Sequence, residues 1–430
     1  MKSILEKILY WSARNVLKKY NPDVIGITGS VGKTSAKEAI ILVLRHRFTV
    51  RGTEKNYNNE IGVPLAIIGI ESPGRSVFGW LFVFGKIAWS LIVRDTAYPQ
   101  ILVLEMGADK PGDIEYLTRL APCKIGVLTA IGPAHLEKFG SMEKLIQEKR
   151  QIVRHLQGGD RWAVIAADDP FVYPLEGPLA VPSITYGFRD DVDVSVASLK
   201  QRAVFIPGRE EIITSTCTIQ YKNEKQDVEI HTIGKQAVCA VLPAIAVSLL
   251  YHFTLEEAAR ALRLYQQPKG RMRCIPGVKR TLIIDDSYNS SPLAARAALD
   301  VLSLFEIRED AKKIAVLGDM LELGEYTEKE HSELGQYIAE RCKVDMLYCV
   351  GPLAKEIAQG ARGAGFDKVA IFCFDTVVPA GKALQNVIKK GDVILVKGSQ
   401  GIRTERVVKE IMATPEKARD LLVRQSKEWI

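Results

Sequence analysis

Short apolar runs alternate with longer amphipathic segments along most of the 430-residue chain. Between residue 24 and about residue 167 the apolar runs read DVIGIT, ILVLEMG, IGVLTAIG and WAVIAAD, and helical stretches separate them. Strands that alternate with helices predict parallel βαβ units. We therefore expect an α/β domain with a mostly parallel sheet in this part of the chain.

The periodicity changes between about residues 183 and 233, where polar and apolar positions alternate in DVDVSVASL, EIITSTCTIQY and DVEIHTIG. A period of two predicts antiparallel strands, which are expected to extend the same domain. A joint rich in Pro and Gly, QQPKGRMRCIPG, follows, and strand and helix patterns then resume from TLIIDDS to DVILVKGS. We expect a central domain over residues 23–269 and a smaller Rossmann-like α/β domain over residues 270–430.

Two further segments predict helices with unusual apolar surfaces. Residues 1–22 predict an amphipathic helix with several lysines. Within an apolar insertion over residues 73–97, the segment from Val77 to Val93 is short for a membrane span and has Lys86 in its middle. It fits a helix lying in a membrane interface or a helix packed on the protein, and the sequence leaves both alternatives open.

Composition narrows the class of protein. The seven cysteines are scattered without a Cys-x-x-Cys pair, which indicates a reducing compartment and disfavours a zinc or disulfide framework. A formal charge of +7 without a long basic run makes nucleic acid an unfavourable partner. Glu6 and Lys7 interrupt the N-terminus before an apolar run develops, so no secretory signal is expected. We expect a cytoplasmic monomer, with peripheral contact at the inner face of the membrane as an open alternative.

A glycine-rich turn links the first predicted strand of the central domain to its first helix. The stretch NPDVIGITGSVGKTS has the spacing Gly-x-x-Gly-Lys-Thr between apolar residues 24–27 and a helical pattern over residues 36–44. In that context backbone N–H groups can hold phosphates, the lysine reaches the outer phosphates and the hydroxyl can bind Mg²⁺. A chance turn before a helix is the alternative. We expect a P-loop central domain whose phosphate-binding residues are Gly29, Ser30, Val31, Gly32, Lys33, Thr34 and Ser35.

Three polar residues that follow this loop are candidate metal ligands. Glu105 ends the apolar strand ILVLE, where its carboxylate can complete a Mg²⁺ shell with Thr34, and a surface carboxylate is the alternative. His135 follows the next strand and could bind a second ion, although a single histidine is more often structural. Lys149 could bind a metal only as a carbamate formed with CO₂, and a solvated helical lysine is the simpler interpretation.

The C-terminal domain also places polar residues at strand ends. Asp286 and Asn289 lie in IIDDSYNSSP, a loop that can hold a ribose or a base edge or simply cap a helix. Lys397 and Ser399 lie in VKGSQG, which ends another strand. Arg271 lies in the joint, from which its guanidinium could reach phosphates when the cleft closes. These loops are expected to face the P-loop across the cleft.

Seven motifs occur in a fixed order between about residues 24 and 411: TGSVGKTSAKE, NYNNEIGVPL, LEMGADKPGDIEYL, AHLEKFGSMEKLIQEK, DDSYNSSP, VLGDMLELGEYTEKEH and VKGSQG. Together they resemble the Mur ligase family, in particular its branch that joins D-alanyl-D-alanine to a muramoyl tripeptide. The resemblance implies an ATP-dependent amide ligase of peptidoglycan precursor synthesis. It implies that ATP phosphorylates a peptide carboxylate, that an amine attacks the acyl phosphate, and that two Mg²⁺ ions take part.

The resemblance also assigns roles to residues at matching positions. The catalytic residues would be Lys33, His135, Lys149 and Arg271. The metal ligands would be Thr34, Glu105, His135 and a carbamoylated Lys149. Asp286, Asn289 and Arg271 would complete the ATP site, and the substrate contacts would come from Asn58, Asn59, Lys397 and Ser399.

Two features depart from the family pattern. Gln236, Ala237 and Ala240 stand where a His-Asn pair and a further Asn usually lie beside the adenine, so adenine is expected to be held differently. Members of this branch also carry a domain before the P-loop for a uridine diphosphate sugar, whereas here one predicted helix precedes the loop. Two alternatives therefore stay open: a lipid-linked or other peptidyl acceptor, and a non-catalytic nucleotide-binding partner.

Overall fold

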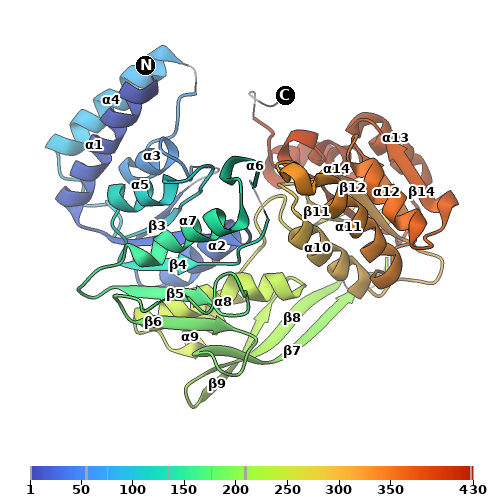
Figure 1. The fold of residues 1–430 in the computed structure, drawn as a ribbon, viewed down its shortest axis with the longest axis horizontal. Coiled ribbons are helices and arrows are strands. Elements are labelled where there is room, and N and C mark those ends of the chain that lie inside the picture. The colour runs from blue at the N-terminus through green and yellow to red at the C-terminus, as the bar shows by residue number, and fades with distance from the viewer. Residues whose placement is uncertain are drawn as a thin grey trace.

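The computed structural model describes residues 2–53, 57–74, 76–133, 136–175, 177–207, 211–426 and 429. In this part of the chain two sheets fall on either side of residue 270, each covered by helices (Figure 1). The predicted α/β fold class is confirmed, because a large, mostly parallel sheet is followed by a second α/β unit.

The first sheet has nine strands in the order β2-β3-β1-β4-β5-β6-β7-β8-β9. Their bounds are β1 (Asp23–Thr28), β2 (Val50–Gly52), β3 (Ile101–Glu105), β4 (Ile125–Leu128), β5 (Trp162–Ala166), β6 (Ser183–Gly187), β7 (Val194–Val204), β8 (Ile212–Tyr221) and β9 (Glu224–Ile230). The apolar sequences of β3 and β4 are buried throughout, as expected for parallel strands covered on both faces.

Helices cover both faces of this sheet. Their bounds are α1 (Lys2–Tyr20), α2 (Lys33–Leu44), α3 (Gly62–Ile68), α4 (Val77–Ile92), α5 (Asp113–Leu120), α6 (Leu136–Phe139), α7 (Met142–Arg154), α8 (Lys235–Leu250) and α9 (Leu255–Leu262). One apolar core joins α2, α8 and α9 to the sheet, and a second joins α1, α3, α4, α5 and α7 to its other face. Successive side chains of β1 point to opposite faces of the sheet, so Ile25 belongs to the first core and Val24 to the second.

One strand differs from the antiparallel pattern predicted for residues 183–233. β6 pairs in parallel with both β5 and β7, whereas β7, β8 and β9 form the expected antiparallel meander. Sixteen residues separate β5 from β6, which is long enough for the crossover that parallel pairing of these two strands requires. The period-two signal identifies a strand but does not specify the direction of its neighbours.

The second sheet has six strands in the order β10-β11-β15-β12-β13-β14 and is parallel except for β10. The strand bounds are β10 (Arg273–Gly277), β11 (Thr281–Asp286), β12 (Lys313–Gly318), β13 (Met346–Val350), β14 (Ile371–Phe374) and β15 (Val393–Lys397). The helix bounds are α10 (Pro292–Leu304), α11 (Thr327–Arg341), α12 (Ala354–Gly363), α13 (Val377–Val387), α14 (Glu405–Ile411) and α15 (Ala418–Leu421). Separate cores join α10, α11 and α12 to one face and α13 and α14 to the other.

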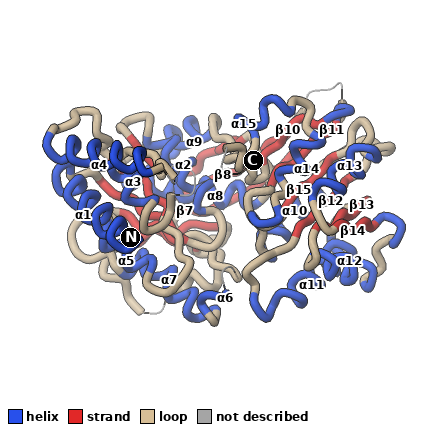
Figure 2. Tube along the Cα trace, turned by 90° about the horizontal axis from the view of Figure 1, so that it is seen from above, coloured by secondary structure: helices blue, strands red, loops and turns tan. Residues whose placement is uncertain are grey.

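The end of β7 connects the two halves of the molecule. The backbone N–H of Phe205 donates to Glu306 O at 3.0 Å, and Glu306 N–H donates to Ala203 O at 2.7 Å. Ala203 also belongs to the apolar core beneath α10. In Figure 1 the long strands β7 and β8 run from the central sheet toward the C-terminal half, and Figure 2 shows the two halves from above. This contact joins the end of β7 to the chain just after α10.

Candidate functional site

The loop between β1 and α2 has the backbone shape that phosphate binding requires. Gly29 has a φ of 149°, and a Cβ atom placed there would lie 2.0 Å from the Thr129 hydroxyl oxygen. Gly32, with a φ of 88°, precedes α2, whose first turn contains no acidic residue. Glycines at these two positions leave the N-terminus of α2 open to an anion, which its dipole and free N–H groups favour.

Thr34 and Glu105 meet at the carboxyl ends of the central strands. The Thr34 hydroxyl donates to Glu105 Oε2 at 2.8 Å, and Arg271 Nη2 donates to Thr34 Oγ1 at 3.0 Å. The Asn58 amide donates to Glu105 Oε1 at 3.3 Å. A hydroxyl and a carboxylate oxygen in contact form a pair that suits Mg²⁺, which prefers oxygen ligands.

The charges around Glu105 keep its carboxylate ionised. Burial by itself would raise the pKa of Glu105, but the positive charges of Lys33 and Arg271 outweigh it and lower the pKa below its ordinary value. The amine of Lys33 donates to Gly29 O at 2.7 Å, and burial lowers its pKa although Glu105 opposes this. An ionised carboxylate beside a hydroxyl is the state that a divalent cation requires.

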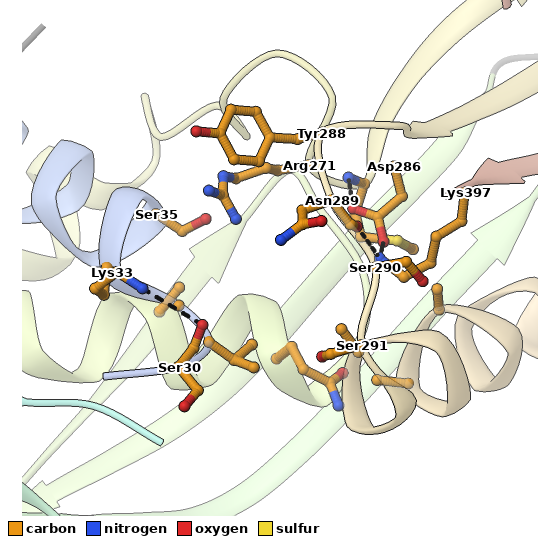
Figure 3. A pocket seen from close by; sticks show the side chains of 18 of the residues that line it. Ser30, Lys33, Ser35, Arg271, Asp286, Tyr288, Asn289, Ser290, Ser291 and Lys397 are labelled. Carbon is orange, nitrogen blue, oxygen red and sulfur yellow. Dashed lines mark hydrogen bonds and ion pairs between the residues drawn. The ribbon is translucent and has the colours of Figure 1, made fainter. Parts of the chain in front are cut away.

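A cavity of about 310 Å³ lies between the P-loop and the C-terminal domain, and we call it the interdomain cavity. Figure 3 shows Ser30, Lys33 and Ser35 on one side and Asn289, Asp286 and Lys397 on the other. Among the residues that complete its lining are Val31, Gly32, Gln236, Ala237, Ala240 and Arg271. The three positions that depart from the family pattern therefore lie in the wall of the cavity.

An ion pair builds the C-terminal side of the interdomain cavity. Lys397 Nζ lies 2.6 Å from Asp286 Oδ2 and also donates to Asn289 O at 2.9 Å. Met272 N–H donates to the other carboxylate oxygen of Asp286 at 3.1 Å. Burial raises the pKa of Asp286, and the charge of Lys397 acts in the opposite direction. The pair holds the Asn289 loop and the end of β15 together.

A second, smaller cavity of about 210 Å³ adjoins the first, and we call it the Lys149 pocket. Its lining includes Asn58, Asn59, Asp109, Tyr116 and Lys149. Lys33, Asn58 and Asp109 line both cavities, so Lys33 stands at their junction. A group bound in the Lys149 pocket can therefore approach a phosphate held by the P-loop.

Lys149 comes from α7, whose N-terminus is capped by Ser141. The side chain is only 2% exposed, and this burial lowers the pKa of Lys149 to about 7, with the positive charge of Lys33 acting in the same direction. A lysine with this pKa has a large neutral fraction near pH 7, and the neutral amine is the form that reacts with CO₂. The alternative of a solvated surface lysine is wrong, because the side chain is buried.

The structure brings most of the predicted site residues together, but not all of them. Asn59 lines the Lys149 pocket while its side-chain oxygen accepts from Gly62 N–H at 2.9 Å near the start of α3. Ser399 is 3% exposed and lines neither cavity; its hydroxyl accepts from Leu321 N–H at 2.9 Å. His135 lies outside the described residues. Among the described residues, no three His, Cys, Asp or Glu side chains gather as a metal cluster.

Several residues that line the cavities were not predicted as site residues, although Asp109 and Tyr288 lie within motifs of the sequence. Asp109 lines both cavities although it lies in a loop of mixed polarity. Gln267 accepts from the Ser35 hydroxyl at 3.5 Å and lines the interdomain cavity from a distance of 232 residues along the chain. Tyr288 packs its ring 4.1 Å from the Arg271 guanidinium. Only the fold brings these residues to the site.

The family comparison agrees with this two-part site. The description "Mur ligase middle domain" matches residues 87–248, and "Mur ligase, glutamate ligase domain" matches residues 270–400. The second match covers the strand ends that carry Asp286 and Lys397. The first covers Glu105 and Lys149.

Individual relatives extend the comparison to nearly the whole chain. A Bacillus subtilis protein named UDP-N-acetylmuramoyl-tripeptide--D-alanyl-D-alanine ligase is 30% identical over 94% of this chain and 79% of its own length. A Haemophilus influenzae protein of the same name is 29% identical over 92% of this chain and 78% of its own. The crystal structure of MurF ligase from Thermotoga maritima in complex with ADP has a TM-score of 0.76 and 28% identity, covering 96% of this chain and 84% of that one. The chain therefore belongs to the Mur ligase family and is a Mur-type ATP-dependent ligase.

Proposed function

We propose that this ligase adds D-alanyl-D-alanine to the terminal carboxylate of a muramoyl tripeptide in peptidoglycan precursor synthesis. The names of the B. subtilis and H. influenzae relatives support this pair of substrates. The observation that carries the proposal is the position of Lys33 at the junction of the interdomain cavity and the Lys149 pocket. A nucleotide phosphate in the first cavity and a carboxylate in the second would meet there.

The proposed reaction proceeds in two steps. A carboxylate oxygen of the acceptor attacks the terminal phosphorus of ATP, the bond to the bridging oxygen breaks, and ADP leaves. The amine of the dipeptide then attacks the acyl carbon, the bond to the phosphate oxygen breaks, and inorganic phosphate leaves while the nitrogen loses a proton. Lys33 and Arg271 carry positive charge near the transferring group, which is the main demand of phosphoryl transfer.

The residues at the P-loop fit a magnesium ion, because Thr34 and the ionised Glu105 present oxygens to the same space. Bound there, Mg²⁺ would neutralise charge on the nucleotide phosphates. We further propose that a carbamoylated Lys149 and His135 would be ligands of a second Mg²⁺ ion. The buried amine of Lys149, with a pKa of about 7, supports the modification.

The C-terminal domain would complete the nucleotide site and position the amine. Asn289 and Asp286 face the P-loop across the interdomain cavity, and Gln236 lines the wall where adenine is expected. Gln236 has an amide that can both donate to and accept from a base edge. Lys397 would act mainly by holding Asp286 and the Asn289 loop in place.

A phosphate-release assay tests the proposed function. The intact protein is supplied with ATP, Mg²⁺, the uridine-linked muramoyl tripeptide and D-alanyl-D-alanine, and we expect release only when both substrates are present. Lys33→Ala should abolish it. Lys368→Ala, at an exposed lysine of the C-terminal domain, is the matched control and should retain it. Turnover that survives in Lys33→Ala would refute the ATP site, and no amine-dependent release with any acceptor would favour a non-catalytic nucleotide-binding partner.

A lipid-linked or other peptidyl carboxylate is the second candidate acceptor. One observation favours it: Tyr116 lines the Lys149 pocket and packs against Tyr10 of α1, with ring centroids 5.3 Å apart, and α1 carries exposed apolar side chains. Comparing phosphate release with the lipid-linked and uridine-linked forms of the same tripeptide separates the two candidates. Faster release with the lipid-linked form would assign it as the acceptor.

A further inference from the structure

The helices α1 and α4 together expose a large apolar surface. We call this surface the α1/α4 face; its members are Ile4, Ile8, Trp11, Val77, Phe78, Leu81, Phe82, Trp89 and Ile92. Phe78 is 84% exposed and Ile92 81%, although both are large apolar residues. Single exposed apolar residues are ordinary in proteins, but a cluster of this kind marks an interaction surface.

The helical pattern explains how this surface arises. Residues 4, 8 and 11 follow one stripe of α1, while Leu9, Ala13 and Val16 are buried on the opposite side. On α4 only Val83 and Ile87 are buried, so this helix rests on the protein by a narrow contact. Trp80, Phe84 and Leu91 are partly buried against the same core, whereas the α4 members of the α1/α4 face are exposed.

The α1/α4 face is also concentrated in one place. Both views place α1 and α4 side by side at the end of the molecule farthest from the C-terminal domain (Figures 1 and 2). Lys19 of α1 links the two helices, because its amine donates to Ser90 O at 2.8 Å and to Val93 O at the C-terminal end of α4. The two helices therefore present the face as a single unit.

Charges around the face have one predominant sign. Residues 77–94 contain Lys86 and Arg94 and no acidic residue, and residues 2–20 contain five basic residues and one glutamate. Lys7, Lys18 and Lys86 are exposed beside the apolar side chains. Aromatic and aliphatic side chains with basic residues at their edge are typical of a helix that lies at the boundary between lipid headgroups and acyl chains.

We propose that the α1/α4 face docks on an anionic lipid bilayer, with α4 lying in the plane of the interface. Among the described residues no helix is long and apolar enough to cross a membrane. A second copy of the chain would match the apolar side chains but would bring like charges together, whereas anionic headgroups complement them. Because α1 packs on α5, which borders the Lys149 pocket, docking would hold that pocket near the membrane surface.

Co-sedimentation with vesicles tests the proposal. The intact protein is mixed with vesicles of phosphatidylcholine alone and with vesicles that also contain phosphatidylglycerol. We expect it to pellet with the anionic vesicles and to bind at least tenfold less to the neutral ones. The triple variant Phe78→Ser, Phe82→Ser and Trp89→Ser should stay in the supernatant with both.

Two further variants make the test specific. The control variant removes three exposed apolar side chains outside the α1/α4 face, by the substitutions Leu264→Ser, Val369→Ser and Val378→Ser. It should pellet like the intact protein. The second variant reverses three charges, by the substitutions Lys7→Glu, Lys18→Glu and Lys86→Glu, and leaves the apolar side chains in place. It should bind anionic vesicles more weakly. Equal pelleting of the intact protein and the Phe78, Phe82, Trp89 variant would overturn the proposal, as would an intact protein that never pellets.

Light scattering after size-exclusion chromatography tests whether a second copy of the chain binds the α1/α4 face instead of lipid. A dimer that the same triple serine variant converts to a monomer would assign the face to a second copy and overturn the lipid proposal. Phosphate release with the uridine-linked tripeptide in vesicle-free solution should be unchanged in that variant, because its three residues lie outside both cavities. Failure of the ligase assay for the intact protein would leave the vesicle result unaffected, so the two proposals fail independently.

Discussion

Lys149 in the central domain and Lys397 in the C-terminal domain are equally buried, each with 2% of its surface exposed, but their surroundings differ. Lys397 forms an ion pair with Asp286 and donates to a backbone carbonyl. For Lys149, no hydrogen bond or ion pair joins its amine to another residue that the structure describes, and its pKa falls to about 7. A buried charge in an ion pair depends on its partner, because removing one member destabilises the fold, whereas a buried amine without a partner among the described residues is a candidate for chemistry.

The largest expected effect is on turnover. Lys149→Met removes the amine that we propose becomes a carbamate, and phosphate release should fall about 100-fold or more, the range seen when one charge-stabilising group is lost. Lys144→Met, at an exposed lysine on the same helix, is the control and should keep full activity. Removing CO₂ and bicarbonate from the buffer should lower the turnover of the intact protein without affecting Lys149→Met. Full activity in Lys149→Met would place this lysine outside the reaction.

Lys397→Met should act on stability instead. It leaves the buried Asp286 carboxylate without its cation, a change that costs about 3–5 kcal/mol when one partner of a buried ion pair is removed. Urea denaturation measures this cost, and Asp286→Asn in the same chain should recover much of it. Lys149→Met should not destabilise the protein, because it removes a desolvated amine that forms no ion pair with a carboxylate in the described part of the chain. An equal loss of stability in both lysine variants would remove the distinction between the two sites.

The dependence of stability on pH sharpens the same comparison. The folded pKa of Lys149 is about 7 and its ordinary value is 10.5, so between these values the unfolded chain holds a proton that the native chain has lost. The contribution of Lys149 to the free energy of unfolding should therefore rise with pH across this window, by at most about 1.4 kcal/mol per pH unit. Below about pH 7 the lysine is charged in both states and the contribution stays at its lowest.

The measurement is a pair of urea denaturation series in CO₂-free buffer, for the intact protein and for Lys149→Met. Titration of other groups affects both series, so the difference between them reports Lys149. Curves that stay parallel from pH 7 to pH 10 would contradict the lowered pKa. Lys144→Met should follow the intact protein throughout.

The sequence predicted the α/β fold and the P-loop because both depend on local patterns. The order of apolar strand, Gly29, Gly32 and helix predicts a phosphate loop from neighbouring residues, and Glu105 lies beside it because β3 pairs in parallel with β1. The burial of Lys149 could not be predicted, because an isolated lysine in a charged helix is normally solvated. Burial follows from the packing of α7 against the sheet, which is a long-range property.

The sequence was less informative about roles within a loop. Lys397 ends the buried strand β15 and Ser399 lies two residues later, and this spacing does not show which one faces a cavity. In the structure Lys397 lines the interdomain cavity, whereas Ser399 bonds to the backbone of a neighbouring loop. This hydrogen bond joins residues 78 positions apart, so no local sequence pattern indicates it. The sequence therefore could not show whether Ser399 contacts the substrate or supports the structure.

The smallest expected effect comes from Ser399→Ala. The hydroxyl of Ser399 accepts from Leu321 N–H at 2.9 Å, and its loss would leave a partly buried donor without this partner, at a cost of about 1 kcal/mol in the free energy of unfolding. The KM for D-alanyl-D-alanine should change less than threefold, because Ser399 lines neither cavity. Ser399→Thr, which keeps the hydroxyl, should recover part of the lost stability. A tenfold rise in KM with unchanged stability would instead make Ser399 a substrate contact, as the family resemblance implies.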